Sequence, residues 1–154
     1  MTLIDASNDF NLNALALGVA ILSFCLLVQV TIIHYAAAGI VFLQKTQRYP
    51  AGIRGYQLTF LVGAVVLVSI HLLHIYIWGY SLYLMGIVMP LKTAILFAGS
   101  TYTTVGFADD PLTGTWQLLT TIMATSGLFS FGMSTSIMFL LSQKIFTLLE
   151  SFRG

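Results

Sequence analysis

The residues best suited to chemistry lie in one short polar segment, which reads Thr103-Thr104-Val105-Gly106-Phe107-Ala108-Asp109. It offers threonine hydroxyls and backbone carbonyls as oxygen ligands. Its glycine permits backbone conformations that a side chain disfavours. We expect Asp109 and the adjacent Asp110 to remain in water, where they attract cations and cap the loop. What this segment can do depends on the elements that hold it.

Three histidines, His34, His71 and His74, lie inside long apolar stretches. Ionisable residues inside a membrane suggest a function by default, and histidine titrates near physiological pH. His71 and His74 are three residues apart on one helix face and could share a metal ion, but the sequence shows no third ligand near them. We favour interhelical hydrogen bonding, and proton sensing and metal binding are the alternatives.

The sequence lacks the motifs of covalent catalysis and nucleotide binding. It contains no glycine-rich phosphate loop, nucleophile elbow, Cys/His metal cluster or pair of separated catalytic carboxylates. With a net charge of +1, it also has no basic face to meet the phosphates of a nucleic acid. We therefore expect neither an enzyme nor a nucleic-acid-binding protein, and no cofactor.

The composition of the 154-residue chain is that of a membrane protein. Hydrophobic residues make up 58% and charged residues 7%, whereas a soluble domain has about 25% charged residues. Asp, Glu, Lys and Arg are absent from 10–44, 55–91 and 111–143. Each interval exceeds the roughly 20 residues that a helix needs to cross a bilayer. The sequence predicts three membrane-spanning helices, at about 11–44, 55–85 and 114–150.

The basic residues predict how these helices are oriented. Lys45, Arg48 and Arg54 flank the first link, and Lys144 and Arg153 follow or end the third helix, so five of the six basic residues lie on one side. The positive-inside rule assigns that side to the cytoplasm. We expect the bacterial inner (plasma) membrane, with the N-terminus outside and the C-terminus cytoplasmic.

Aromatic and small residues predict where the helices meet lipid and one another. The aromatic side chains near the outer ends of the second and third helices are typical of an interfacial belt; they are Trp78, Tyr80, Tyr83 and Trp116. The small residues of 36–39 should let the first helix approach the second closely.

The segment 86–113 must leave and re-enter the same face of the membrane. Pro90 can open a helix at its first turn, and Leu91 to Thr101 would continue it. Such a helix is too short to span. Irregular backbone at membrane depth is tolerated only where it is buried in protein or lines a watery cavity. A short helix followed by a Thr/Gly-rich return predicts a pore loop.

The segment 103–109 resembles the selectivity filter of the potassium channel superfamily, usually written T-V-G-Y-G-D. The resemblance implies a homotetramer that conducts K⁺ and places oxygen rings around the ion path. The filter residues would be Thr104, Val105, Gly106, Phe107 and Ala108, with Asp109 at the outer mouth. The expected fold class is an all-α membrane protein with three transmembrane helices, a re-entrant pore helix and a filter loop.

The third helix also resembles the inner helix of two-helix potassium channels. Gly127 matches a glycine at which that helix bends, and the resemblance makes Leu128, Phe131, Thr135 and Phe139 a cavity face. For Gly127, the alternative role is close packing against another helix. The other four residues form a stripe along one side of the helix, and the alternative is that this stripe faces lipid or another helix. Residues 55–154 would form the channel domain. Residues 1–54 would be the added span and link of a bacterial three-helix branch.

Two departures from the family pattern keep other functions open. Phe107 replaces the common Tyr, and Ala108 replaces the second Gly, where a left-handed backbone would cost about 1–2 kcal/mol per subunit. A weakly selective monovalent cation channel is therefore an alternative. Two others are a non-conducting subunit that binds a partner or metal through its histidines, and a small b-type cytochrome.

Overall fold

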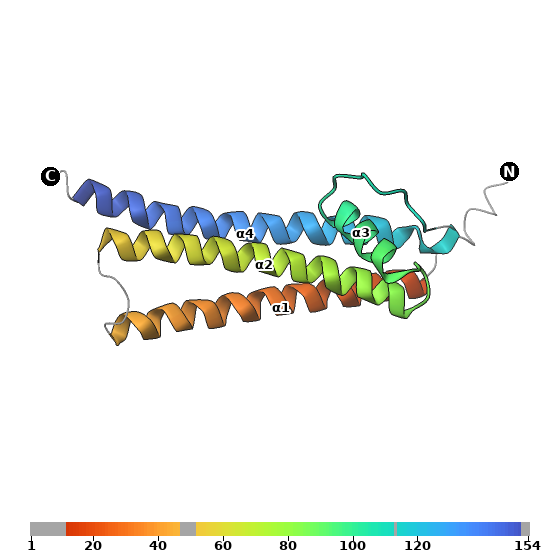
Figure 1. Ribbon diagram of the computed structural model, residues 1–154, viewed down its shortest axis with the longest axis horizontal. Helices are drawn as coiled ribbons and strands as arrows, with labels where there is room; N and C mark the ends of the chain where they lie inside the picture. Colours follow the sequence, from red (N-terminus) through yellow and green to blue (C-terminus); the bar gives the residue numbers. More distant parts are fainter. Residues whose placement is uncertain (1–11, 47–51, 113, 152–154) are drawn as a thin grey trace. The chain divides into compact units, whose positions relative to one another are not determined.

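The computed structural model describes residues 12–46, 52–112 and 114–151 of the chain, without the side chains of Gln44, Thr115, Leu148, Leu149 and Ser151. These residues form four α-helices and one short 3-10 helix, and no strand occurs among them (Figure 1). The helices are α1 (Leu12–Lys45), α2 (Ile53–Leu84), α3 (Leu91–Tyr102), η1 (Gly114–Trp116) and α4 (Leu118–Ser151).

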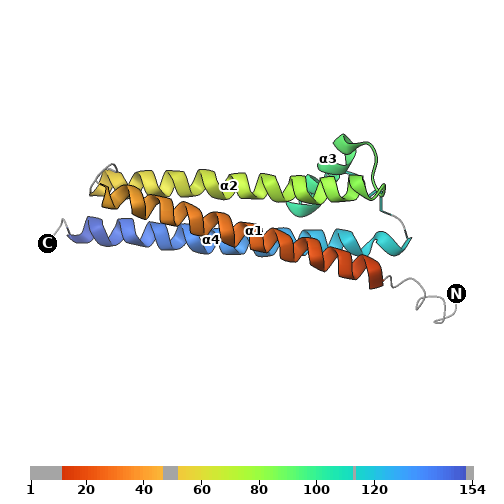
Figure 2. The ribbon, with the colours of Figure 1, turned by 90° about the horizontal axis from the view of Figure 1, so that it is seen from below.

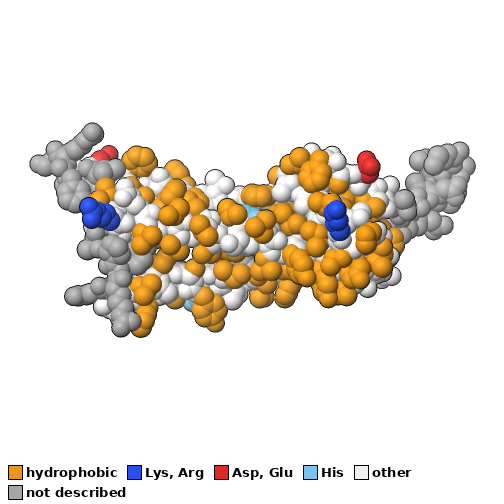
Figure 3. Space-filling view, viewed as in Figure 1, with side chains coloured by type: hydrophobic (Ala, Val, Ile, Leu, Met, Phe, Trp, Pro, Cys, Tyr) orange, Lys and Arg blue, Asp and Glu red, His pale blue; other side chains and the backbone are white. Residues whose placement is uncertain are grey.

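Three of these helices, α1, α2 and α4, are long and apolar enough to cross a membrane. This confirms the three predicted spans and the coarse assignment to an integral membrane protein. Hydrophobic side chains cover much of the face drawn in Figure 3, where charged groups are few. The third span begins at Leu118 rather than at 114, because Gly114 has a φ of +56° and opens the separate turn η1.

The chain divides into two compact units, and each long helix contributes to both. We call the first the loop unit; its described parts are 12–27, 72–112 and 114–129. It contains α3 and the loop that follows it. We call the second the three-helix unit; its described parts are 28–46, 52–71 and 130–151. Figure 2 shows the same helices in a second view.

The loop unit has a continuous apolar core to which all four of its α-helical segments contribute. Its largest buried side chains are Trp78, Phe97, Tyr102, Leu82 and Leu119. Burial of Trp78 corrects its assignment to an interfacial belt. Its indole N–H donates to the Ser126 hydroxyl over 3.4 Å, so the side chain meets its polar requirement inside the protein.

In the three-helix unit, polar groups take up much of the buried interior. Gln29 of α1 is fully buried, and its side-chain amide donates to the Ser130 carbonyl (3.3 Å) and the Ser134 hydroxyl (3.5 Å) of α4. Gln29 is therefore a hydrogen-bond donor between α1 and α4. The expected close approach at 36–39 is wrong. A Cβ on Gly39 would meet no atom within 4 Å, and Ala37 and Ala38 are exposed.

Candidate functional site

The candidate site begins with α3, a helix of twelve residues. At a rise of 1.5 Å per residue it is about 18 Å long, well short of the roughly 30 Å of a bilayer core. Pro90 stands at its N-cap with extended backbone, and Thr103 caps its C-terminus by donating its backbone N–H to the Gly99 carbonyl over 3.1 Å. The predicted helix over 91–101 is therefore observed with one further residue.

The loop after α3 has an alternating backbone. Thr104 has a φ of +59° and Gly106 a φ of +71°, with Val105 between them. Thr104 is the one non-glycine with positive φ among the described residues. A left-handed conformation costs about 1–2 kcal/mol for a residue with a Cβ, and a β-branched residue rarely adopts it. Strain of this kind persists only where the surroundings enforce it, and it is concentrated at functional sites.

Ser100 anchors this loop to α3. Its hydroxyl accepts a hydrogen bond from the backbone N–H of Ala108 (2.9 Å), and its carbonyl accepts one from the N–H of Gly106 (3.2 Å). Ser100 is 1% exposed. Two points of the loop are therefore fixed to one buried residue. Sequence reasoning missed Ser100, although a small polar residue in the last turn of the short helix was a signal for it.

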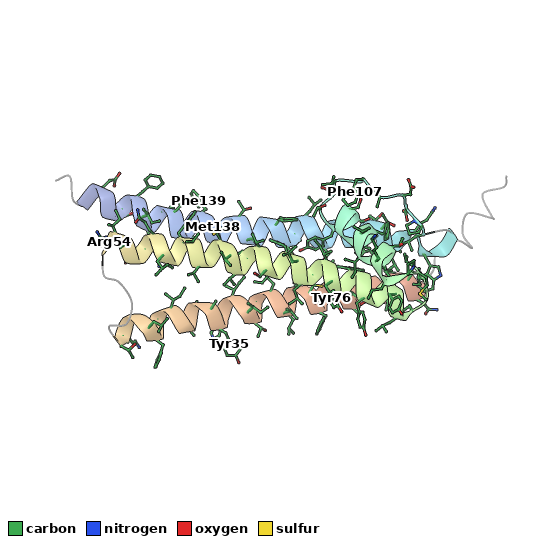
Figure 4. All side chains as sticks on the ribbon, in the orientation of Figure 1. Tyr35, Arg54, Tyr76, Phe107, Met138 and Phe139 are labelled. Atoms are coloured by element: carbon green, nitrogen blue, oxygen red, sulfur yellow. The ribbon has the colours of Figure 1, made fainter. Side chains whose placement is uncertain are left out.

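Two apolar side chains of the loop and that of Asp109 extend outward in the single chain. Val105 is 68% exposed and Phe107 65% exposed, and Figure 4 labels the Phe107 side chain extending from the loop. Asp109 is also exposed. Asp110 does the capping, since its carboxylate accepts from the N–H of Leu112 (2.9 Å) and the hydroxyl of Thr120 (3.0 Å).

Tyr102, the last residue of α3, joins the loop to two other helices. Its hydroxyl lies 3.0 Å from Nδ1 of His74 on α2, and both residues are fully buried. Its carbonyl oxygen lies so close to Gly127 of α4 that a Cβ there would overlap it. Gly127 therefore allows close helix packing, one of the two roles considered for it. The hinge role stays a prediction.

The predicted stripe on α4 is exposed in the single chain. Leu128 and Phe139 are each 61% exposed and Phe131 is 38% exposed; Figure 4 labels Phe139 pointing away from its helix. Thr135 is exposed, and its hydroxyl donates to the Phe131 carbonyl of the same helix over 2.9 Å. Phe131 differs from the others because its ring stacks on His71, with centroids 4.1 Å apart.

The three histidines have different surroundings. His34 is exposed and makes an edge contact with the ring of Tyr35 at 6.0 Å. His71 stacks on Phe131, and His74 meets Tyr102. Within the described part of the chain, no group of three or more His, Cys, Asp or Glu side chains could hold a metal ion.

Comparison with protein-family models, with curated proteins and with solved structures finds no match to this chain. The interpretation of the loop therefore depends on its residues, its backbone and its anchoring.

Proposed function

We propose that this chain is one subunit of a tetrameric potassium channel in which residues 104–108 line the ion path. The observation that supports this most directly is the loop after α3, where Thr104 and Gly106 are left-handed and Ser100 holds both Gly106 and Ala108. Ions would move down their electrochemical gradient without covalent chemistry.

The backbone alternation suits a cation path. A dehydrated K⁺ needs oxygen atoms in place of its water shell, and successive carbonyls can face one side of a strand only if backbone handedness alternates. The C-terminal end of α3 lies immediately before the loop. A helix C-terminus carries partial negative charge and favours a nearby cation.

Exposed apolar side chains support the proposed assembly. A single strand supplies one part of each oxygen ring, so several copies must meet around the ion path, and the family resemblance implies four. Val105, Phe107 and Leu128 are more than half exposed in the isolated chain. Neighbouring copies would cover part of this surface, with the stripe on α4 facing a cavity and Phe139 narrowing its cytoplasmic end. Asp109 would stand at the outer mouth.

Potassium flux into liposomes tests the proposal, with two glycines as a matched pair. Gly106 and Gly114 both have positive φ, and a Cβ on either would meet no atom within 4 Å of the chain itself. Gly106→Ala should reduce flux by about tenfold or more, because strain enters the ion path, while Gly114→Ala should conduct. The proposal is wrong if the wild-type protein passes no K⁺, or if the two variants behave alike.

One observation favours weak selectivity as a second candidate. Ala108 is not among the residues with positive φ, so the position of the second family glycine does not take a left-handed conformation here. The outermost oxygen ring would then differ from that of a selective filter. Ala108→Gly should shift reversal potentials in a K⁺/Na⁺ gradient toward K⁺. An unchanged reversal potential would remove this candidate.

A further inference from the structure

The three-helix unit has a cavity of about 260 Å³ between α1, α2 and α4 that is open on one side. All the residues that line it belong to this unit. Only Tyr56, Thr59 and Lys144 among them are polar; the remainder are aliphatic residues and one glycine, Gly63. The cavity is therefore apolar over most of its length. We call it the slot.

The polar residues of the slot lie at one end. Tyr56 and Thr59 come from the first turns of α2, and Lys144 comes from the last third of α4, whereas the other end is formed by residues such as Leu67 and Ile137. Eleven residues separate Tyr56 from Leu67, or about 16 Å along a helix. One leaflet of a bilayer has a hydrocarbon depth of about 15 Å. The slot thus has the length and polarity of one lipid chain with its head group.

Charge indicates which lipid fits. Lys45 and Arg54 lie at the same end of the unit as Lys144, and all three are exposed. Glu150, six residues beyond Lys144 on α4, is the one acidic side chain described at this end. Basic side chains at a membrane surface attract anionic lipids, and lysine can extend its ammonium group from an apolar wall to the interface.

We propose that the slot binds one acyl chain of an anionic phospholipid, with its phosphate at Lys144 and Tyr56. The chain would occupy the apolar part between α1, α2 and α4. The small side chains of Ala36 and Ala37 leave room for it. This site involves none of residues 100–110, so lipid binding can be tested independently of ion conduction.

Native mass spectrometry of the whole chain tests whether the positive charge at the polar end of the slot selects anionic lipid. The protein is mixed with equal amounts of dioleoyl phosphatidylglycerol and dioleoyl phosphatidylcholine, which differ only in their head groups. Wild type should retain phosphatidylglycerol about fivefold over phosphatidylcholine. Lys144→Gln should abolish this preference, whereas Lys92→Gln, an equally conservative change of an exposed lysine on α3 in the loop unit, should keep it. Equal retention by wild type, or equal loss in both variants, would overturn the proposal.

A second pair of variants tests whether the acyl chain enters the slot. Ala37 lines it, and its neighbour Ala38 does not. Ala37→Phe should lower retention of both lipids at least fivefold, while Ala38→Phe, of equal size and similar exposure, should not. Circular dichroism checks that both variants are helical. Lys144 is exposed, so Lys144→Gln tests the same site without altering the packing of the helices. Unchanged lipid retention with an altered oligomer mass in Ala37→Phe would assign the slot to a second copy of the chain and refute the proposal.

Discussion

The loop unit and the three-helix unit are built from the same three long helices but are packed in different ways. The loop unit holds the whole continuous apolar core, from Ala14 to Met123. In the three-helix unit, the buried residues include Gln29, His71, Ser130 and Ser134, and a slot remains open between the helices. Dense packing occurs where a strained loop must be held. Where no such loop is present, a few polar contacts hold the helices.

The two kinds of packing are the two ways in which helices can associate when lipid is the solvent. Lipid tails are as apolar as leucine, so helix association in a membrane depends on close packing and interhelical hydrogen bonds rather than on the hydrophobic effect. The loop unit relies mainly on close packing, as at Gly127 and Gly79, where an added Cβ would meet the backbone of α3. The three-helix unit relies more on the hydrogen bonds of Gln29.

The largest expected effect separates two glycines of α4. In the loop unit, Gly127→Ala would drive a Cβ into the carbonyl of Tyr102, a backbone group that cannot move aside. We expect a loss of about 3 kcal/mol, the upper part of the range for overpacking. In the three-helix unit, Gly132→Ala meets no atom within 4 Å and should stay within about 1 kcal/mol. Unfolding in detergent measures both, and equal losses would contradict the difference in packing.

A smaller effect is expected at the anchor of the loop. Ser100→Ala removes the hydroxyl that accepts from the Ala108 N–H, which should cost about 1 kcal/mol. Hydrogen exchange of the Ala108 amide should speed up about fivefold, while amides of α2 are unchanged. Ser69→Ala is the control, because the Ser69 hydroxyl bonds to Val65 of its own helix and is exposed. Unchanged exchange at Ala108 would show that Ser100 does not hold the loop.

The smallest effect is expected for the change of Gln29 to leucine. Gln29→Leu removes both hydrogen bonds to α4, but it also removes a buried carbonyl oxygen, Oε1, that has no hydrogen-bond partner among the described residues. Polar contacts between membrane helices average about 0.6 kcal/mol, so the net change should be below about 1 kcal/mol. Gln29→Ala leaves a cavity and should cost about 2 kcal/mol or more. Equal losses in the two variants would show that the hydrogen bonds, which both variants lack, outweigh the packing of the side chain.

The sequence predicted the long helices well because length and charge alone determine them. Three charge-free intervals became α1, α2 and α4, and the break at Pro90 marked the start of α3. The start of α4 was less accurate, since the turn at Gly114 depends on backbone geometry that composition does not reveal. Trp78 was placed at the interface by its position along the helix. Its burial depends on Ser126, which is 48 residues away in sequence.

The sequence predicted the short helix and the loop that follows it, but not the details of the loop backbone. The sequence pointed to residues 104–108 as the segment of unusual backbone, and left-handed conformation was expected at glycine. That Thr104 also adopts it could not be predicted, because a β-branched residue rarely takes this conformation. The slot had no sequence signal, because a gap between three apolar faces depends on how their side chains fit and not on any periodic pattern.

Tyr102 restricts how far the loop can move relative to α2 and α4. Its hydroxyl is tied to α2 through His74, its carbonyl abuts α4 at Gly127, and the strained Thr104 follows only two residues later. A sliding or tilting of either helix at this level must therefore be absorbed within two peptide units. A movement of α2 or α4 would therefore change the backbone conformation of the loop directly, with no other segment needed to transmit it.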